Sequence, residues 1–168
     1  MALIIEDGTA LENSEVYCSV AFADAYHAAR GNDAWDNVDN KEAALRKAAD
    51  YIGQAYRANW AGTRVSDTQS MDWPRYNVPR TDSAGSYYPS NAVPIELQKA
   101  NAEFALKTVD GDLLADTDAP VIEETVGVIT TRYAAGTSQA KKFPAVDKLL
   151  APLMTNSGFG GSVRLIRA

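Results

Sequence analysis

Residues 41–58, KEAALRKAADYIGQAYRA, decide the fold class of this 168-residue chain. Apolar side chains recur along the stretch at the i, i+3, i+4, i+7 spacing of one helical face. These positions are Leu45, Ala48, Ala49, Ile52, Ala55 and Tyr56. Asp39 or Asn40 stands where an N-cap is expected. Because the apolar face is rich in alanine, a neighbouring helix can approach it closely, and the stretch predicts a long helix within a helical bundle.

Two more helices are expected before and after this one. Ser19 is a candidate N-cap for a helix that Gly31 ends. Its apolar stripe holds Phe22, Ala25, Tyr26 and Ala29. Pro94 suits the first turn of a helix that runs to about Val109, because a missing N–H costs nothing there. This later helix carries apolar residues on two stripes, which is expected of a helix that is central in a bundle or lies between subunits.

A β-hairpin and a short helix complete the expected single domain, residues 1–154. Residues 121–133 contain β-formers on both sides of Gly127, which supplies the turn. Pro144 opens the last helix, and Pro152 limits it to about ten residues. Residues 155–168 follow as a glycine-rich tail that is expected to be flexible. The expected fold is mainly α, a small bundle of about four helices with a β-hairpin, a long irregular loop and an extended C-terminal tail.

The segment from 59 to 93 has no regular period, because prolines, glycines and short polar residues interrupt it. Loops of this length are uncommon in compact domains and are usually functional or ordered by a partner. This loop holds the large aromatic side chains of Trp60, Trp73, Tyr76, Tyr87 and Tyr88. We expect Trp60, Trp73, Pro74 and Arg75 to form its structural motif. Trp73 is the expected anchor, because Pro74 restricts the preceding backbone to extended geometry.

Composition argues against several classes of protein. One cysteine, Cys18, and one histidine, His27, leave no disulfide framework and almost no basis for metal or triad chemistry. Neither the paired acids nor the glycines have the spacing of a catalytic or phosphate-binding motif. The longest apolar runs fall far short of the ~20 residues of a membrane helix. The sequence therefore predicts a soluble protein that is not an enzyme, uses no cofactor or metal, and has no membrane partner.

Charge is spread unevenly along the chain, whose formal net charge is −6. Residues 1–50 hold ten acids and four bases, a local charge of −6. Residues 128–168 hold six bases and one acid, a local charge of +5. Such asymmetry indicates a surface with two faces or a basic end that meets an acidic partner. The alternative is that the asymmetry serves solubility alone.

Basic and aromatic residues alternate within and beside the long loop, which suits a nucleic-acid interface as well. Single-stranded DNA could contact a positive groove through Arg57, Arg64, Arg75 and Arg80 while its bases stack on aromatic rings. The net negative charge opposes this interpretation, because phosphate contacts need a positive field. The favoured interpretation is that Trp60 and Trp73 fold the loop onto the bundle and that Arg75 makes a structural pair.

Several stretches follow one ordered pattern: residues 19–31, 43–56, 69–75, 93–105 and 143–153. The most specific is Gln69-Ser-Met-Asp-Trp-Pro-Arg75, followed by the helix that Val93-Pro94 opens. This pattern resembles the head–tail adaptor (connector, head-completion) proteins of tailed bacteriophages, some of which are labelled DnaT-like single-stranded DNA-binding proteins. The resemblance covers about residues 15–154, so residues 1–14 and the tail lie outside it.

The resemblance implies a structural protein of the virion, made in the host cytoplasm and located at the head–tail interface. It implies a homo-oligomeric ring, a dodecamer, beneath the portal protein. Such a ring extends the DNA channel and offers a platform to a downstream tail, stopper or nozzle protein. Viral double-stranded DNA would pass through it during packaging and ejection without sequence-specific binding.

The glycine-rich tail ends in apolar residues that alternate with arginines. We expect this segment to bind the portal, because such a strand can dock onto a sheet edge or groove of another protein. The residues concerned are Phe159, Val163, Arg164, Leu165, Ile166 and Arg167.

Overall fold

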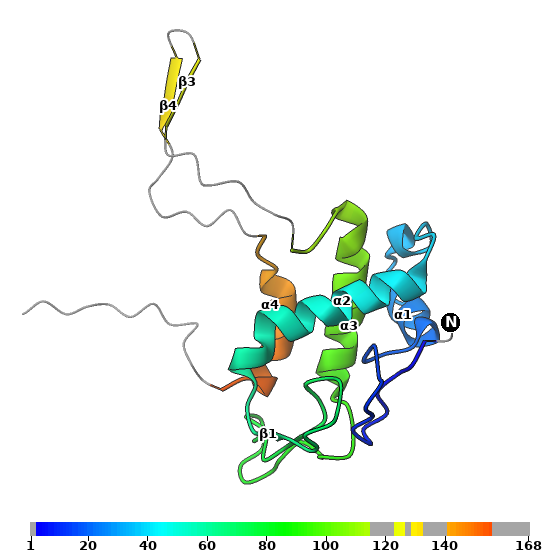
Figure 1. Ribbon diagram of the computed structural model, residues 1–168. Coiled ribbons are helices and arrows are strands. Elements are labelled where there is room, and N and C mark those ends of the chain that lie inside the picture. The colour runs from blue at the N-terminus through cyan, green and yellow to red at the C-terminus, as the bar shows by residue number, and fades with distance from the viewer. Residues whose placement is uncertain (1–2, 115–122, 127–128, 133–140, 156–168) are drawn as a thin grey trace, which may run out of the picture.

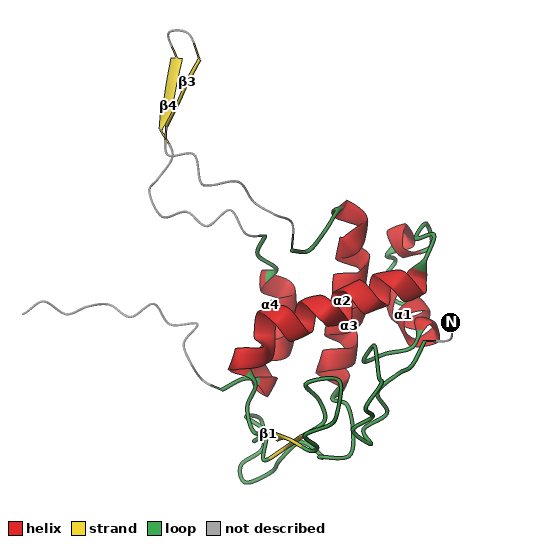
Figure 2. Cartoon of the chain, in the orientation of Figure 1, coloured by secondary structure: helices red, strands yellow, loops and turns green. Residues whose placement is uncertain are grey.

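A computed structural model describes residues 3–114, 123–126, 129–132 and 141–155 (Figures 1 and 2). Over these residues the fold is mainly α, as the sequence predicts. The α-helices are α1 (Val20–Ala28), α2 (Lys41–Tyr56), α3 (Ile95–Lys107) and α4 (Pro144–Leu150). Short 3₁₀ turns cover Asp33–Trp35, Arg57–Asn59, Thr108–Asp110 and Ala151–Leu153. The strands are β1 (Thr63–Arg64) paired with β2 (Arg75–Tyr76), and β3 (Glu123–Val126) paired with β4 (Ile129–Arg132), both antiparallel.

Helix α3 is the centre of the bundle and packs against α1, α2 and α4 (Figure 1). Its buried residues are Leu97, Ala100, Asn101, Ala102, Phe104 and Ala105. Burial on more than one side confirms the prediction of a central helix. The buried residues of α2 are Ala44, Leu45, Ala48, Ala49, Tyr51, Ile52 and Tyr56. The small alanine side chains on both helices allow the close approach that the sequence indicates.

The helix starts follow local sequence signals. The Ser19 hydroxyl accepts a hydrogen bond from the Phe22 N–H at 3.0 Å, and the Asn40 side chain accepts one from the Ala43 N–H at 2.9 Å. Both contacts satisfy N–H groups that the first helical turn leaves unpaired. Helix α2 ends at Tyr56, two residues before the predicted end, and continues as the 3₁₀ turn Arg57–Asn59.

The buried face of α1 differs from the predicted stripe. Ala23, Tyr26 and His27 are buried, whereas Ala25 and Ala29 are exposed. The predicted apolar stripe does not include His27, because histidine is polar. In the structure, however, both ring nitrogens of His27 have hydrogen-bond partners. Nε2 lies 3.1 Å from the Ala102 carbonyl oxygen, and Nδ1 lies 3.1 Å from the amide nitrogen of Asn32. Because both nitrogens have partners, burial of the ring carries no large desolvation cost.

The predicted hairpin is confirmed between residues 123 and 132. Its register runs from Glu123 opposite Arg132 to Val126 opposite Ile129. Gly127, the predicted turn residue, lies outside the described residues. On the helical side, Lys141 Nζ donates to the carbonyl oxygens of Asp110 at 3.5 Å and Asp112 at 3.3 Å. Lys141, which precedes α4, therefore lies beside residues 110–112, which follow α3.

The last described residues are attached to the end of α2. The Ala61 N–H donates to the Leu153 carbonyl at 3.0 Å, and the Thr155 N–H donates to the Asn59 carbonyl at 2.9 Å. The Tyr56 hydroxyl donates to Asp147 of α4 at 2.5 Å. These contacts fix α4 against α2 and set where the chain continues beyond Thr155.

A buried carboxylate organises the segment that precedes α1. Glu6 is 2% exposed and accepts hydrogen bonds from the backbone N–H groups of Gly8, Ala10 and Leu11 and from the Ser14 hydroxyl, all between 2.9 and 3.0 Å. Gly8 has φ +103°, and a Cβ there would lie 2.3 Å from the Asn91 carbonyl oxygen. Only glycine fits this close approach, so the segment is held against the end of the long loop.

Candidate functional site

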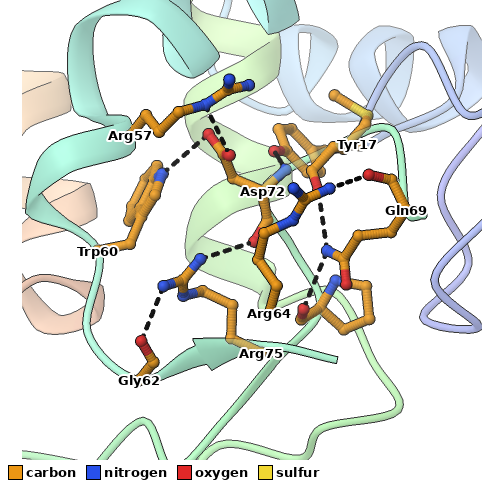
Figure 3. A network of polar contacts seen from close by, with 10 residues as sticks. Tyr17, Arg57, Trp60, Gly62, Arg64, Gln69, Asp72 and Arg75 are labelled. Atoms are coloured by element: carbon orange, nitrogen blue, oxygen red, sulfur yellow. Dashed lines mark hydrogen bonds and ion pairs between the residues drawn. The ribbon is translucent and has the colours of Figure 1, made fainter. Parts of the chain in front are cut away.

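The loop between α2 and α3 contains a small sheet that periodicity does not predict. β1 pairs with β2, with Thr63 opposite Tyr76 and Arg64 opposite Arg75. Strands of two residues carry no alternating pattern, so their pairing depends on the side chains between them. Figure 3 draws the polar network of this region, in which Tyr17 and Arg57 join residues of the loop.

Trp73 is the buried anchor that the sequence predicts. Its side chain is fully buried, and its ring packs edge-on against Trp60, with ring centroids 5.9 Å apart. Trp60 in turn lies 6.0 Å from the ring of Tyr56 at the end of α2. The Trp73–Pro74 peptide bond is cis. The aromatic pair thus joins the loop to the helices instead of facing solvent.

Arg75 makes its contacts inside the loop (Figure 3). Its guanidinium donates to three backbone carbonyls: Ala61 at 2.7 Å, Gly62 at 2.8 Å and Asp72 at 3.2 Å. Burial lowers the pKa of Arg75 below its usual range. Because a planar guanidinium fixes several acceptors at once, Arg75 holds the two sides of the loop together.

Asp72 is the centre of a second set of contacts and is 3% exposed. Its carboxylate accepts from Arg57 Nε at 3.0 Å and from Trp60 Nε1 at 3.3 Å. Its backbone N–H donates to the Tyr17 hydroxyl at 3.2 Å. Burial raises the pKa of Tyr17, and the negative charge of Asp72 adds to this effect. The network therefore reaches from the end of α2 to the segment before α1.

Gln69 closes the loop from the other side and is 2% exposed. Its amide donates to the carbonyls of Met71 at 2.8 Å and Pro74 at 3.2 Å, and it accepts from the Ser66 N–H at 2.9 Å. The guanidinium of Arg64 donates to the Gln69 carbonyl. The sequence pattern does not predict the roles of Gln69, Asp72 and Tyr17, because nothing in the local sequence marks a polar side chain as buried.

The four arginines considered for single-stranded DNA do not share one groove in this structure. Arg57, with a side chain 67% exposed, lines a cleft of about 710 Å³ beside α2. Arg80 lines a separate pocket of about 210 Å³, where its guanidinium lies 4.8 Å from the Tyr88 ring centroid and pairs with Asp82 at 3.3 Å. Arg64 and Arg75 are engaged within the loop, as described above. Two loop aromatics, Tyr76 and Tyr87, are exposed.

Cys18 and His27, the one cysteine and the one histidine of the sequence, are both buried. Burial raises the pKa of the Cys18 thiol to about 12, which keeps it protonated and unreactive. Burial lowers the pKa of His27, which favours its neutral form. Within the described ranges, no three His, Cys, Asp or Glu side chains gather where they could hold a metal ion. No helix in the part of the chain that the structure describes is long and apolar enough to cross a membrane.

The tail residues predicted to bind a portal lie outside the described residues; they are Phe159, Val163, Arg164, Leu165, Ile166 and Arg167. Of the predicted loop motif, Trp60 and Trp73 pack against each other, the Pro74 carbonyl accepts from Gln69, and Arg75 donates to the Ala61 carbonyl.

These observations define a small, mainly α-helical protein. The arginine and tryptophan side chains of its long loop stabilise the folded chain itself. The family model described as "Putative DnaT-like ssDNA binding protein" matches residues 1–168, so the chain belongs to this family. Comparison with curated proteins and with solved structures gives no match.

Proposed function

We propose that this chain is a structural head–tail adaptor of a tailed bacteriophage. In this proposal copies of the chain form a ring beneath the portal, extend the DNA channel and offer a platform for tail or stopper proteins. The chain acts at the head–tail interface of the virion, with no enzymatic step, cofactor or membrane contact. The ordered sequence pattern and the helical bundle with its inserted hairpin support the proposal.

One observation carries most weight in favouring a structural role. Trp73 and Arg75, the most specific residues of the family pattern, are used inside the loop, where Trp73 is fully buried and Arg75 binds backbone carbonyls. A fully buried Trp73 cannot stack on bases, and the guanidinium of Arg75 is held in place by three backbone carbonyls. They give the loop a fixed shape instead, which a subunit needs if it is to make the same contacts with two neighbours.

Charge supports the same proposal. An acidic body suits a channel through which DNA must slide, because a basic lumen would hold phosphates strongly. Each contact in a ring of small subunits is individually modest. Docking on a preformed portal ring raises the effective concentration of neighbouring subunits and closes the ring.

The test is the mass of the particle, measured by native mass spectrometry with and without portal rings. We expect weak association of the chain alone and a complete ring on the portal. A variant ending at Thr155 should keep its helical content and melting behaviour but fail to sediment with portal rings. A closed ring at nanomolar concentration without portal would contradict assembly on the portal, and normal sedimentation of the shortened variant would move the interface to the bundle or the loop.

Single-stranded DNA binding is the second candidate, and the description of the family favours it. Exposed residues that could serve it are Arg57, Arg64, Tyr76 and Tyr87. A mobility-shift titration with single-stranded DNA at low and at physiological salt tests this candidate. Micromolar, steeply salt-dependent binding that is lost in Arg57→Ala or Tyr87→Ala would establish it and displace the adaptor proposal as the primary function.

A further inference from the structure

A cleft with a volume of about 710 Å³ lies beside α2, between that helix and residues 14–17 and 70–72. Gly53 lines it, and a Cβ at this position would meet nothing closer than 3.8 Å. The cleft also has apolar walls, which include Ala49 and Met71. It can therefore accept a short peptide segment with both charged and apolar side chains.

Charge in this cleft is not fully compensated. Its carboxylates are Glu15, Asp50 and Asp72, and its guanidiniums are Arg46 and Arg57, which leaves one negative charge in excess. Arg46 pairs with Glu15 at 3.0 Å, and Arg57 pairs with Asp72 at 3.0 Å. Asp50 has no ion pair or hydrogen bond from its side chain to a described residue. The cleft therefore offers Asp50 to an added cation.

The C-terminal segment of the chain has the matching chemistry. Residues 156–168 contain two arginines and no acid, and Arg164 and Arg167 flank the apolar pair Leu165-Ile166. The region from 128 to 168 carries +5, against −6 in residues 1–50, which include Asp50 and Glu15. An arginine can pair with the free carboxylate while its apolar neighbours cover Ala49 and Met71.

We propose that residues 163–167 dock in the cleft beside α2 of their own chain. This inference concerns the free protein and does not rest on the proposed function. If the tail also binds a portal, the portal and the cleft compete for the same segment.

The geometry of the chain permits docking within one molecule. The Thr155 N–H is hydrogen-bonded to the Asn59 carbonyl. Asn59 lies nine residues beyond Asp50, which corresponds to about 14 Å along the helix direction at 1.5 Å per residue. The nine residues from Thr155 to Arg164 can span about 30 Å. This reach exceeds the axial distance plus the roughly 10–12 Å diameter of the helix. A short tether also gives an effective concentration in the millimolar range, which favours the same chain over a second copy.

The test places a nitroxide spin label on the full-length variant Ala168→Cys. Cys18 does not compete for the label, because its thiol is 2% exposed and burial raises its pKa to about 12. We expect strong paramagnetic broadening of the amide signals of Asp50, Gly53 and Gln54, unchanged on dilution. Two variants should abolish it: Asp50→Lys, which reverses the free charge, and Gly53→Leu, which fills the cleft without changing charge.

Two matched controls separate charge pairing from general effects. Asp39→Lys makes the same charge change at an exposed site outside the cleft and should leave the broadening intact. Arg164→Glu with Arg167→Glu should restore broadening in the Asp50→Lys background. The proposal is overturned if the parent shows no broadening, or if broadening survives both Asp50→Lys and Gly53→Leu. It is also overturned if the broadening arises in a mixture of isotope-labelled chains and separate spin-labelled chains, because the occupant is then a second copy.

Discussion

The helical bundle and the loop from 59 to 93 share one core but are stabilised in different ways. In the bundle, α2 and α3 bury mostly apolar side chains, many of them alanine, and their backbone polar groups are satisfied within each helix. In the loop, a few long side chains satisfy the backbone: Arg75 binds three carbonyls and Gln69 binds two. Stability in the bundle is spread over many small contacts, whereas in the loop it is concentrated in a few residues.

This difference has a consequence for substitutions. A helix that loses one methyl group keeps its hydrogen bonds, and the neighbouring side chains remain in place. A loop that loses Arg75 leaves buried carbonyl groups without donors, and each costs free energy. We therefore expect the loop to be the more sensitive region, and the following experiments test that comparison.

The largest effect is expected from Trp73→Ala. The fully buried indole joins the loop to Trp60 and the helices, so its removal should lower the free energy of unfolding by about 3–5 kcal/mol. Chemical denaturation monitored by circular dichroism measures this. Tyr87→Ala is the control in the same loop, because Tyr87 is 59% exposed and its loss should stay within about 0.5 kcal/mol. An unchanged melting temperature in Trp73→Ala together with lost DNA or partner binding would refute the anchor role.

Arg75→Lys should have the next largest effect. Lysine keeps the charge but lacks the planar fork that reaches Ala61, Gly62 and Asp72, so we expect a loss of about 2–3 kcal/mol. Arg57→Lys is the matched control, because that side chain is 67% exposed and its pair with Asp72 contributes about 1 kcal/mol or less. Equal losses in the two variants would show that the three carbonyl contacts of the Arg75 fork contribute no more than the single exposed ion pair of Arg57.

Ser19→Ala tests how sensitive the stability of the helical bundle is to the loss of a single contact. It removes the acceptor of the Phe22 N–H at the start of α1 and should cost about 1 kcal/mol, the usual value of an N-cap. The same denaturation measurement applies, with Ser19→Asp as the variant expected to keep the cap. A loss larger than that of Arg75→Lys would reverse the order of sensitivity proposed for the two regions.

The smallest effect is expected from the titration of His27, because a single group is involved. Burial lowers its pKa in the folded state below the ordinary histidine value of 6.5, so the unfolded chain binds the proton more readily. The contribution of neutral His27 to stability is complete above that value and is lost as pH falls from it towards the folded-state pKa. The denaturation midpoint of the parent protein should decrease as pH is lowered from 7.5 to 5. The midpoint of His27→Gln should depend less strongly on pH. Parallel pH profiles would exclude His27 as the cause.

The sequence by itself determined the helices, their starting residues and the hairpin. Ser19, Asn40 and Pro94 each act through contacts within one helical turn, and the face of α2 repeats with the helical period. Such features are local, so a local pattern is sufficient to find them. The burial of Trp73 could also be predicted, since a large aromatic in an irregular loop needs a place in the core.

Only the tertiary structure decided which polar residues are buried and which charges remain free. Ala55 lies on the predicted apolar stripe yet is exposed, and His27 is polar yet buried. Asp72 and Asp50 are both aspartates near arginines, but Asp72 is 3% exposed within a network, whereas Asp50 lines a cleft and forms no ion pair with a described residue. The physical reason is that burying a polar group costs free energy unless hydrogen-bond partners satisfy it. For His27 and Asp72, some of those partners, such as the Ala102 carbonyl and the Tyr17 hydroxyl, come from distant segments that only the packing of the chain brings close.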